Sequence, residues 1–292
     1  MEVIKTDKAL GAEIIDIDLS KNVSKAEQKF IFDAYTDNLV LLFKGQSLSF
    51  DDLLRLREIF GAAGLTANQL LGLGRKKYYP DEVPDDITII SNIIEEGGRP
   101  RGSLGNGEAF WHTDSSFRKI PSNGSILHGI STTNKGGNTL FANMYKAYED
   151  LDEILKQKIR NLRVVHDHEY IIKLSTELSR RKNKGNYDKL DPVIHPLVRR
   201  HPVTKKPSLF LSPHTMVKIV DYDYDKGRKL LEKLIEHSIQ SKYVYEHIWN
   251  NDDIVMWDNR CTMHSVKPFD NNIIKRIMHR VTLVGDKEPV MA

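Results

Sequence analysis

The sequence predicts a mainly β protein with packed helices, an α+β fold built on an antiparallel sandwich or barrel. Two observations indicate this class. From about residue 125 onward the chain is divided into many short apolar or β-branched segments separated by turn residues. Helical spacing of apolar residues recurs in only a few stretches, near residues 25–37, 50–60, 145–160 and 226–241. Short strands with a few amphipathic helices fit a sheet core that helices cover.

The composition is that of an ordinary globular chain. Its 292 residues are 40% hydrophobic and 28% charged, which is enough for one large core. The formal net charge is +3, from 43 basic and 40 acidic residues, so the balance argues against a dedicated nucleic-acid surface and suits small anionic substrates. The single cysteine, Cys261, excludes an intrachain disulfide and a Cys-rich zinc site, and it fits a reducing compartment.

No segment predicts a signal peptide or a membrane span. Residues 1–7 carry charges where a signal peptide has its apolar segment. The longest apolar runs, such as residues 39–43, are far shorter than the ~20 residues that a membrane-spanning helix needs. We therefore expect a cytoplasmic protein that does not bind membranes.

The first part of the chain predicts two strands and two capped helices. Ser24 and Glu27 form a capping box at the start of a helix over about residues 25–37. Ser49 caps a second helix that ends at Gly61. Alternation of apolar and acidic residues predicts a half-solvated strand at 11–19, and a continuous apolar run predicts a buried strand at 39–43.

The rest of the chain predicts mostly strands, with one loop and one insert. Glycines make residues 97–107 a flexible loop, and the polar stretch near 170–190 reads as an exposed insert. The basic run inside that insert has no interleaved aromatic residues, so it does not predict a nucleic-acid surface. Because no repeat or linker marks a boundary, we expect residues 1–292 to form one domain. Strands are predicted at 87–92, 125–130, 139–143, 208–211, 243–249, 253–257 and 276–284.

The candidate chemistry centres on the run Trp111-His112-Thr113-Asp114. Side chains at i and i+2 of an extended segment point to the same face, so His112 and Asp114 can direct one nitrogen and one oxygen at a metal ion. Such a pair needs a third ligand from elsewhere in the chain. His264 follows an apolar strand and a polar turn, as expected where a strand delivers a side chain to the mouth of a cavity.

A second metal group competes with this one. His166-Asp167-His168-Glu169 has the same alternation, and a further ligand is available from His195, His201 or His214. This group would suit Zn²⁺ in a hydrolase with Glu169 as the general base. A binding barrel without catalytic activity is the remaining alternative.

Four motifs, taken in order, resemble the TauD/TfdA family of Fe(II)- and 2-oxoglutarate-dependent dioxygenases. They are Trp111–Asp114, the Gly-Gly-x-Thr that ends at Thr139, Trp257-Asp258-Asn259-Arg260 leading to His264, and the pair Arg276 and Arg280. The resemblance spans about residues 10–286 and implies a double-stranded β-helix, or jelly roll, as the core. A zinc hydrolase would leave the ordered Thr139, Arg276 and Arg280 unexplained.

The resemblance implies a role for each motif residue. His112, Asp114 and His264 would be the iron ligands, a two-histidine, one-carboxylate set that leaves positions open for 2-oxoglutarate and O₂. Arg276 would bind the distal carboxylate of 2-oxoglutarate bidentately, and Thr139 would join that contact. Arg280 would meet the acidic group of the primary substrate. Such an enzyme couples oxidative decarboxylation of 2-oxoglutarate, to succinate and CO₂, to oxidation of a small substrate.

The resemblance also indicates candidate substrate contacts. Asn92, Leu104, Gly105 and His214 match positions where related sequences have pocket residues. The C-terminal third is most similar to members that degrade aryloxyalkanoates, which implies a carboxylate substrate. The segment at residues 104–108, just before the His-x-Asp motif, is similar to members that tailor amino-acid-derived natural products, including isonitrile-forming enzymes. Desaturation or decarboxylation of the substrate is therefore an alternative to hydroxylation. Homo-oligomers are common in the family.

Overall fold

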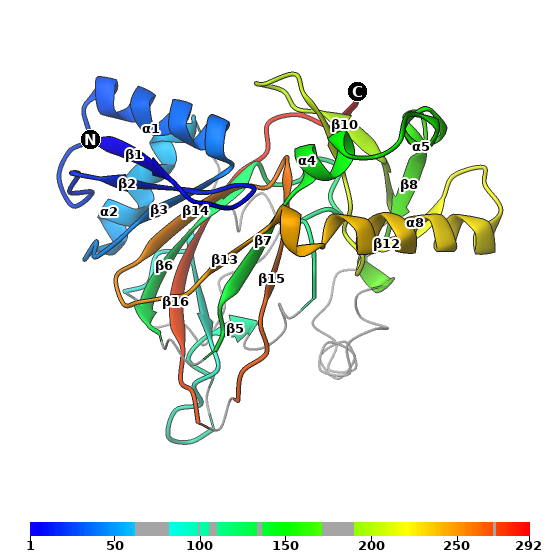
Figure 1. The fold of residues 1–292 in the computed structure, drawn as a ribbon. Helices are drawn as coiled ribbons and strands as arrows, with labels where there is room; N and C mark the ends of the chain where they lie inside the picture. Colours follow the sequence, from blue (N-terminus) through cyan, green and yellow to red (C-terminus); the bar gives the residue numbers. More distant parts are fainter. Residues whose placement is uncertain (62–81, 99, 105–109, 133–135, 171–189, 271–272) are drawn as a thin grey trace.

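The computed structural model describes residues 1–61, 82–98, 100–104, 110–132, 136–170, 190–270 and 273–292 (Figure 1). Two features of the sequence analysis lie outside these ranges. One is Gly105 among the candidate substrate contacts, and the other is nearly all of the insert expected near 170–190.

An eight-stranded sheet is the largest layer of the molecule. Its strands pair antiparallel except for β2 with β3 and β4 with β5. Strands from the start of the chain lie beside strands from its end, so both halves of the sequence build one layer (Figure 1). The order is β1 (Glu2–Lys5), β2 (Ala12–Ile15), β3 (Val40–Phe43), β14 (Ile254–Asp258), β6 (Gly124–Ser131), β16 (Ile277–Leu283), β4 (Ile87–Ser91) and β5 (Ser103–Leu104).

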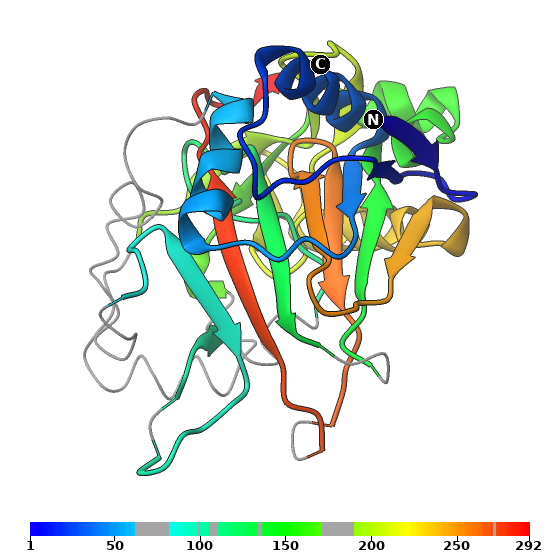
Figure 2. The same ribbon diagram turned by 90° about the vertical axis from the view of Figure 1, so that its left-hand side faces the viewer.

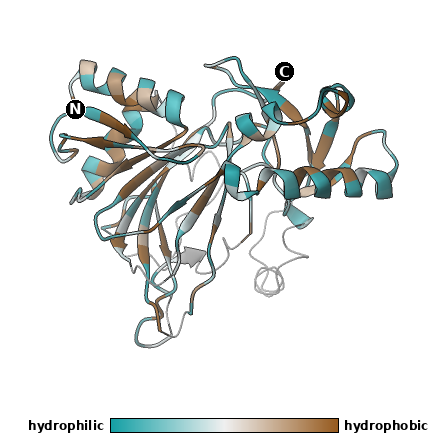
Figure 3. Cartoon of the chain, in the orientation of Figure 1, coloured by the Kyte–Doolittle hydropathy of each residue, from teal (hydrophilic) through white to brown (hydrophobic). Residues whose placement is uncertain are grey.

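A smaller antiparallel sheet packs against the large one. It consists of β13 (Val244–His247), β7 (Thr139–Asn143) and β15 (Thr262–Val266), with β7 in the middle. The two layers meet at Phe141 and Trp257, whose ring centroids are 5.5 Å apart. Both side chains are buried, and the strands that carry them are predominantly hydrophobic (Figure 3). This is the antiparallel sandwich that the short strands predicted.

Two N-terminal helical segments cover the outer face of the large sheet (Figure 2). They are α1 (Lys25–Asn38) and α2 (Phe50–Arg55), the latter continued by the 3₁₀ helix η1 (Leu56–Phe60). The capping box at Ser24 is confirmed, and Ser49 forms a second one with Asp52. Tyr35 of α1 ties this helix to the sheet by donating a hydrogen bond to the main-chain carbonyl of Trp257 in β14, 2.8 Å away.

The remaining elements form a second hydrophobic cluster beside the sandwich. The long helix α8 (Tyr224–Ser238) packs through Leu230, Leu231 and Leu234 and turns a hydrophilic face outward (Figure 3). The other members are two three-stranded sheets and short helical segments: β8 (Arg163–His166), β9 (Val193–Pro196) and β12 (Met216–Ile219); β10 (Val198–Arg200), β11 (Pro207–Leu209) and β17 (Val290–Met291); α4 (Met144–Glu149), α5 (Glu153–Ile159) and η2 (Ser241–Tyr243).

Some predicted elements differ from the structure. The single helix expected at 145–160 is two helices, because the Asp152 side chain caps a new start by accepting from the Leu155 amide. Ile154, one of the apolar residues whose helical spacing predicted that helix, is 82% exposed. The loop expected at 97–107 contains the short strand β5, and the strand expected at 243–249 is preceded by η2. None of the described helices is long and apolar enough to cross a bilayer.

Candidate metal centre

The backbones of His112 and His264 are paired directly. Each amide donates to the other's carbonyl over 2.9 Å, which makes an isolated antiparallel bridge at β15. Residues that exchange both hydrogen bonds in this way point their side chains to the same face. His112 is the only residue of the His-x-Asp motif in a bridge, since Asp114 already begins a turn.

Three ligand atoms converge on one point. Asp114 Oδ1 lies 3.6 Å from His112 Nε2 and 3.8 Å from His264 Nε2, and the two imidazole rings are 4.1 Å apart between centroids. A divalent ion with bonds of about 2.0–2.2 Å holds neighbouring ligand atoms ~3 Å apart, and small inward movements of these side chains reach that spacing. The donor set therefore fits a metal ion.

Hydrogen bonds orient two of these ligands. His112 Nδ1 lies 2.7 Å from the carbonyl of Phe110, so Nδ1–H donates and Nε2 keeps the lone pair that a metal ion needs. Ser125 Oγ donates to Asp114 Oδ2 over 3.2 Å, which leaves Oδ1 turned toward the histidines.

The protonation states also suit metal binding. Burial alone would raise the pKa of the Asp114 carboxyl, but the neighbouring His264, His112 and Arg280 outweigh it and hold this pKa well below its ordinary value. Burial and the nearby His112 lower the pKa of His264 to about 3. Near neutral pH the centre therefore presents a carboxylate and a neutral imidazole, the forms that coordinate metals.

A second group of side chains lies around Trp249. Its indole Nε1–H donates to Thr139 Oγ1 over 3.0 Å, and the guanidinium carbon of Arg276 lies 6.0 Å from its ring centroid. Thr139 and Arg276 are both buried. Gly137, with φ of 71°, packs beside them, and a Cβ at that position would lie 3.3 Å from Phe269 and 3.7 Å from Arg276. The structure thus brings Thr139 and Arg276 to one aromatic side chain, for which no motif in the sequence predicts a role.

Arg280 lies close to the metal-ligand candidates. Its Nη1 is 3.8 Å from Asp114 Oδ1, and it extends from β16, which also follows Arg276. The His214 ring meets the His112 ring edge-to-face at 5.1 Å between centroids. Burial and the nearby His112 lower the pKa of His214 well below its ordinary value. Both side chains therefore face the centre, as their predicted substrate roles require.

Two of the remaining candidate substrate residues lie within the described ranges, Asn92 just after β4 and Leu104 at the end of β5. Asn92 holds the main chain just before β16: its amide nitrogen donates to the carbonyl of Ile274 over 2.6 Å, and its Oδ1 accepts from the Arg276 amide over 2.9 Å. Leu104 ends β5, which pairs with β4. Neither observation tests a substrate contact, so both roles stay predictions.

The rival histidine pair does not form a metal group among the described residues. His166 is buried against Phe210, and its Nδ1 is 2.9 Å from the hydroxyl of Thr215. His168 lies past the end of β8, where its ring packs on Phe117 at 4.2 Å between centroids. The strand ends at His166, so the rings of His166 and His168 do not share one face of a strand.

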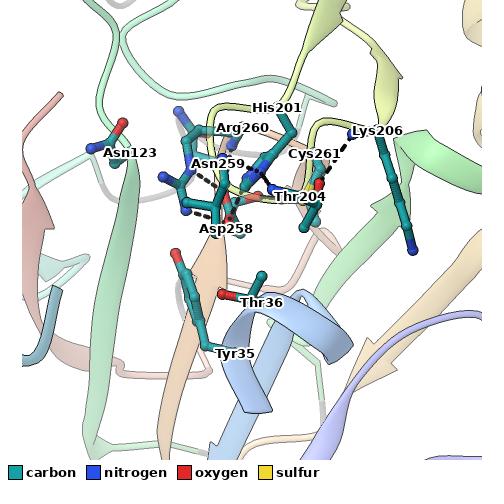
Figure 4. Close-up of polar contacts among 12 residues, drawn as sticks. Tyr35, Thr36, Asn123, His201, Thr204, Lys206, Asp258, Asn259, Arg260 and Cys261 are labelled. Atoms are coloured by element: carbon teal, nitrogen blue, oxygen red, sulfur yellow. Dashed lines mark hydrogen bonds and ion pairs between the residues drawn. The ribbon is translucent and has the colours of Figure 1, made fainter. Parts of the chain in front are cut away.

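A buried polar cluster lies at the turn from β14 to β15 (Figure 4). Arg260 donates to both oxygens of Asp258, at 2.8 and 2.6 Å, and His201 Nε2 lies 3.1 Å from the same carboxylate. His201 Nδ1 accepts from the amides of Val203 and Thr204.

His201, Asp258 and Cys261 bring ligand atoms within 4.8 Å of one another, but they do not suit a metal ion. The Arg260 guanidinium already neutralises the carboxylate, and both His201 nitrogens are engaged. Burial raises the pKa of the Cys261 thiol well above its ordinary value, so the thiolate that binds metals is disfavoured. The cluster is a structural ion pair.

Comparison with known proteins identifies relatives along nearly the whole chain. The sequence model of the family described as taurine catabolism dioxygenase TauD, TfdA family matches residues 2–282. An alpha-ketoglutarate-dependent 2,4-dichlorophenoxyacetate dioxygenase from Burkholderia sp. (strain RASC) is 32% identical over 283 residues, covering 94% of this chain and 91% of the relative. Pentalenolactone F synthase from Streptomyces arenae is 30% identical over 293 residues, covering 95% and 93%. A crystal structure of AAD-2 in complex with Mn(II) and N-oxalylglycine aligns with 99% of both chains, at a TM-score of 0.76 and 29% identity.

The chain belongs to the TauD/TfdA family. It is an Fe(II)- and 2-oxoglutarate-dependent dioxygenase that uses O₂, and its core is the predicted jelly roll. Mn(II) and N-oxalylglycine in the AAD-2 structure mimic the iron and 2-oxoglutarate. The zinc hydrolase and the non-catalytic binding barrel, both open on the sequence, are wrong.

Proposed function

We propose that His112, Asp114 and His264 hold the iron. The observation that carries this proposal is the convergence of three ligand atoms, with Asp114 Oδ1 within 3.8 Å of both Nε2 atoms. Two imidazoles and one carboxylate on one side would leave the opposite positions open, as oxygenases of this kind require. When bound, the iron with 2-oxoglutarate and O₂ supplies the oxidant and yields succinate and CO₂.

Arg276 and Thr139 bind the distal carboxylate of 2-oxoglutarate in this proposal. A buried guanidinium can bind a carboxylate through two parallel N–H donors. Thr139 Oγ1 already accepts from Trp249, so its own O–H is available to donate to the same carboxylate. Trp249 contacts both residues, and all three side chains are buried, so the surroundings of low polarity would strengthen the contact.

The primary substrate is a small carboxylate-bearing molecule that is held near Arg280. The Arg280 guanidinium lies on the side of the Asp114 carboxylate and provides a positive charge for an acidic group. His214, packed on His112, would contact the same substrate from the other side, and Asn92, Leu104 and Gly105 remain candidate contacts. The 2,4-dichlorophenoxyacetate of the relative named above is a carboxylate, which supports this class.

Oxidative tailoring of a natural product is the second candidate function. The similarity to pentalenolactone F synthase, a biosynthetic enzyme by its name, supports it, since that relative matches nearly as well as the 2,4-dichlorophenoxyacetate dioxygenase. The same oxidant would then desaturate or decarboxylate an amino-acid-derived substrate, as in isonitrile formation, and the iron and 2-oxoglutarate contacts would be unchanged.

A substrate screen tests both. Small carboxylates, sulfonates and amino-acid derivatives are incubated with the protein, Fe(II) and 2-oxoglutarate, and substrate-dependent succinate release and O₂ uptake are measured. Mass spectrometry of the product separates a gain of oxygen from a loss of hydrogen or CO₂. Succinate release with sulfonates or uncharged compounds, but with no carboxylate, would contradict the proposed substrate class.

We also propose that residues 1–292 form one domain. Strands from both ends of the chain share the eight-stranded sheet, so neither half can complete that layer alone. A cooperative unfolding transition that is the same by circular dichroism and by tryptophan fluorescence would support it. Light scattering of the purified protein tests the homo-oligomer that the family resemblance suggests.

A further inference from the structure

We propose that Asn259 is a positioning residue that sets the geometry of the iron ligand Asp114 before metal binds. This inference rests on the proposed function, because it takes Asp114 to be a ligand. Asn259 itself does not face the three ligand atoms. It acts on the main chain of Asp114 from the turn between β14 and β15.

The Asn259 side chain pairs with both backbone groups of Asp114. Its Oδ1 accepts from the Asp114 amide over 2.9 Å, and its Nδ2 donates to the Asp114 carbonyl over 3.0 Å. Nδ2 also donates to the carbonyl of Ser122 over 2.8 Å. The orientation of the amide is unambiguous, because one end faces an N–H and the other faces two carbonyls. A side-chain amide here replaces the neighbouring strand that Asp114 lacks.

Asn259 is itself held rigidly on its other sides. Its amide donates to the carbonyl of Asn123 over 3.0 Å, and its carbonyl accepts from the buried Arg199 over 2.6 Å. Arg199 in turn stacks on Phe210, with its guanidinium carbon 3.9 Å from the ring centroid. The ion pair of Asp258 with Arg260 fixes the residues on either side of Asn259 (Figure 4).

This arrangement connects two ligands of the centre. The turn that presents Asn259 leads directly into β15, which carries His264. The Asp114 main chain therefore takes its position from the same turn that starts the His264 strand, so its carboxylate needs only a small side-chain movement to join the imidazoles. Replacing a residue that is one hydrogen bond away from a metal ligand typically weakens metal binding by about 10–100-fold.

The test compares Mn(II) binding by Asn259→Ala and by Thr262→Val. Thr262 is the first residue of β15, directly after this turn. It is buried, and its hydroxyl donates to the Asp258 carbonyl over 2.8 Å, which spans the turn. The matched control thus removes a buried hydrogen bond of the turn and leaves the Asp114 contacts in place. Affinity is measured by quenching of tryptophan fluorescence and by the electron paramagnetic resonance signal of free Mn(II), and stability by thermal unfolding.

We expect Asn259→Ala to weaken Mn(II) binding by about 10–100-fold and to broaden the resonance of the bound ion. Thr262→Val should lower the unfolding temperature and keep Mn(II) affinity within about 3-fold of the original protein. Mn(II) affinity and a resonance spectrum unchanged in Asn259→Ala would overturn the inference, as would equal losses of affinity in both variants. Wild-type protein that binds no Mn(II), or an Asp114→Ala variant that binds it normally, would instead contradict the proposed function.

Two further measurements keep the test decisive if Asn259→Ala does not fold. Asn259→Asp preserves the side-chain volume and the acceptor for the Asp114 amide but loses the donor, so we expect weaker Mn(II) binding here too. In the unaltered protein, hydrogen exchange of the segment around Asp114 should be equally slow with and without Mn(II). Fast exchange that only the metal suppresses would show that Asn259 does not preorganise this ligand.

Discussion

His112 and His264, which lie far apart in the sequence, exchange both of their backbone hydrogen bonds. The distance between the two imidazoles is therefore set by main-chain pairing and does not depend on side-chain packing alone. The third proposed ligand, Asp114, lies outside this pairing and is held by side chains instead, Asn259 on its backbone and Ser125 on its carboxylate. The centre is assembled from one strand and one loop, and the loop needs the additional support.

Removing a ligand should abolish metal binding. Loss of a residue that only hydrogen-bonds a metal ligand typically weakens metal binding by ~10–100-fold. We expect Asp114→Ala to weaken Mn(II) or Fe(II) binding by more than this and to release no substrate-dependent succinate. His166→Gln is the matched control, since it alters the buried histidine of the rival group and should keep metal affinity. Titration of the purified variants measures both. Normal turnover by Asp114→Ala would rule out its role as a ligand.

Replacing Arg276 should weaken 2-oxoglutarate binding. Lysine keeps the charge but not the planar fork, and a hydrogen bond between charged groups is worth about 1.5–3 kcal/mol. Arg276→Lys should therefore raise the KM for 2-oxoglutarate at least ~10-fold, with metal affinity unchanged. Arg200→Lys, at an exposed position of β10, is the control. A KM equal to that of the original protein would remove Arg276 from the 2-oxoglutarate site.

The Trp249 contact makes a separate prediction. Trp249→Phe keeps an aromatic ring beside Arg276 but removes the donor to Thr139, whose hydroxyl is then free to rotate. A neutral hydrogen bond contributes about 0.5–1.5 kcal/mol, so the KM for 2-oxoglutarate should rise by about 2- to 10-fold. Combining this change with Thr139→Val should add little to the KM of Thr139→Val alone, because both act through one hydroxyl. Fully additive effects would contradict the coupling.

Much of the fold followed from local signals in the sequence. The strand Thr139–Asn143 matches its prediction residue for residue, because a glycine turn starts it and an asparagine that caps α4 ends it. The capping box at Ser24 marked the start of α1 in the same way. By contrast, the strands β8, β9 and β12 were missed. They are short, and their pairing with one another decides their conformation more than their residues do.

The centre was predictable only in part for a similar reason. His112, Asp114 and His264 could be proposed as ligands because metal ligands are restricted to a few residue types in recognisable order, and the structure brings the three side chains together. Asn259 and Trp249 lack such a signal. Each acts through a hydrogen bond to a residue more than a hundred positions away, and an asparagine or tryptophan in an apolar strand or turn is usually structural. Only the folded chain reveals these contacts.

The ion pair of Asp258 with Arg260 should be important for stability. Both side chains are largely buried, so Arg260→Leu leaves an uncompensated carboxylate and should cost about 3–5 kcal/mol in the free energy of unfolding. Asp33→Asn, which breaks the exposed pair with Lys29 on α1, should cost less than about 1 kcal/mol. Urea unfolding measures both. A loss in Arg260→Leu no larger than that in Asp33→Asn would show that the carboxylate is not buried as described.

The buried His195 should make the protein less stable in mild acid. Burial lowers its pKa to about 4, from an ordinary value near 6.5, and its Nε2 lies 2.9 Å from the Arg118 carbonyl. Below about pH 6.5 the unfolded chain protonates this imidazole and the folded chain does not, so its contribution is complete above pH 6.5 and is lost as the pH falls to about 4. One such proton changes the free energy of unfolding by at most about 1.4 kcal/mol per pH unit.

His195→Gln isolates that contribution, because a glutamine amide can still donate to the Arg118 carbonyl but does not titrate. Urea unfolding in the presence of a chelator, at pH values from 7 to 4, should give a shallower decline of stability with falling pH for the variant than for the original protein. His166, whose ring lies 5.3 Å from that of His195, is coupled to it, and the buried histidines outside this pair contribute equally to both curves and cancel in the difference. Parallel curves would mean that His195 titrates normally in the folded protein, and therefore that water reaches its ring.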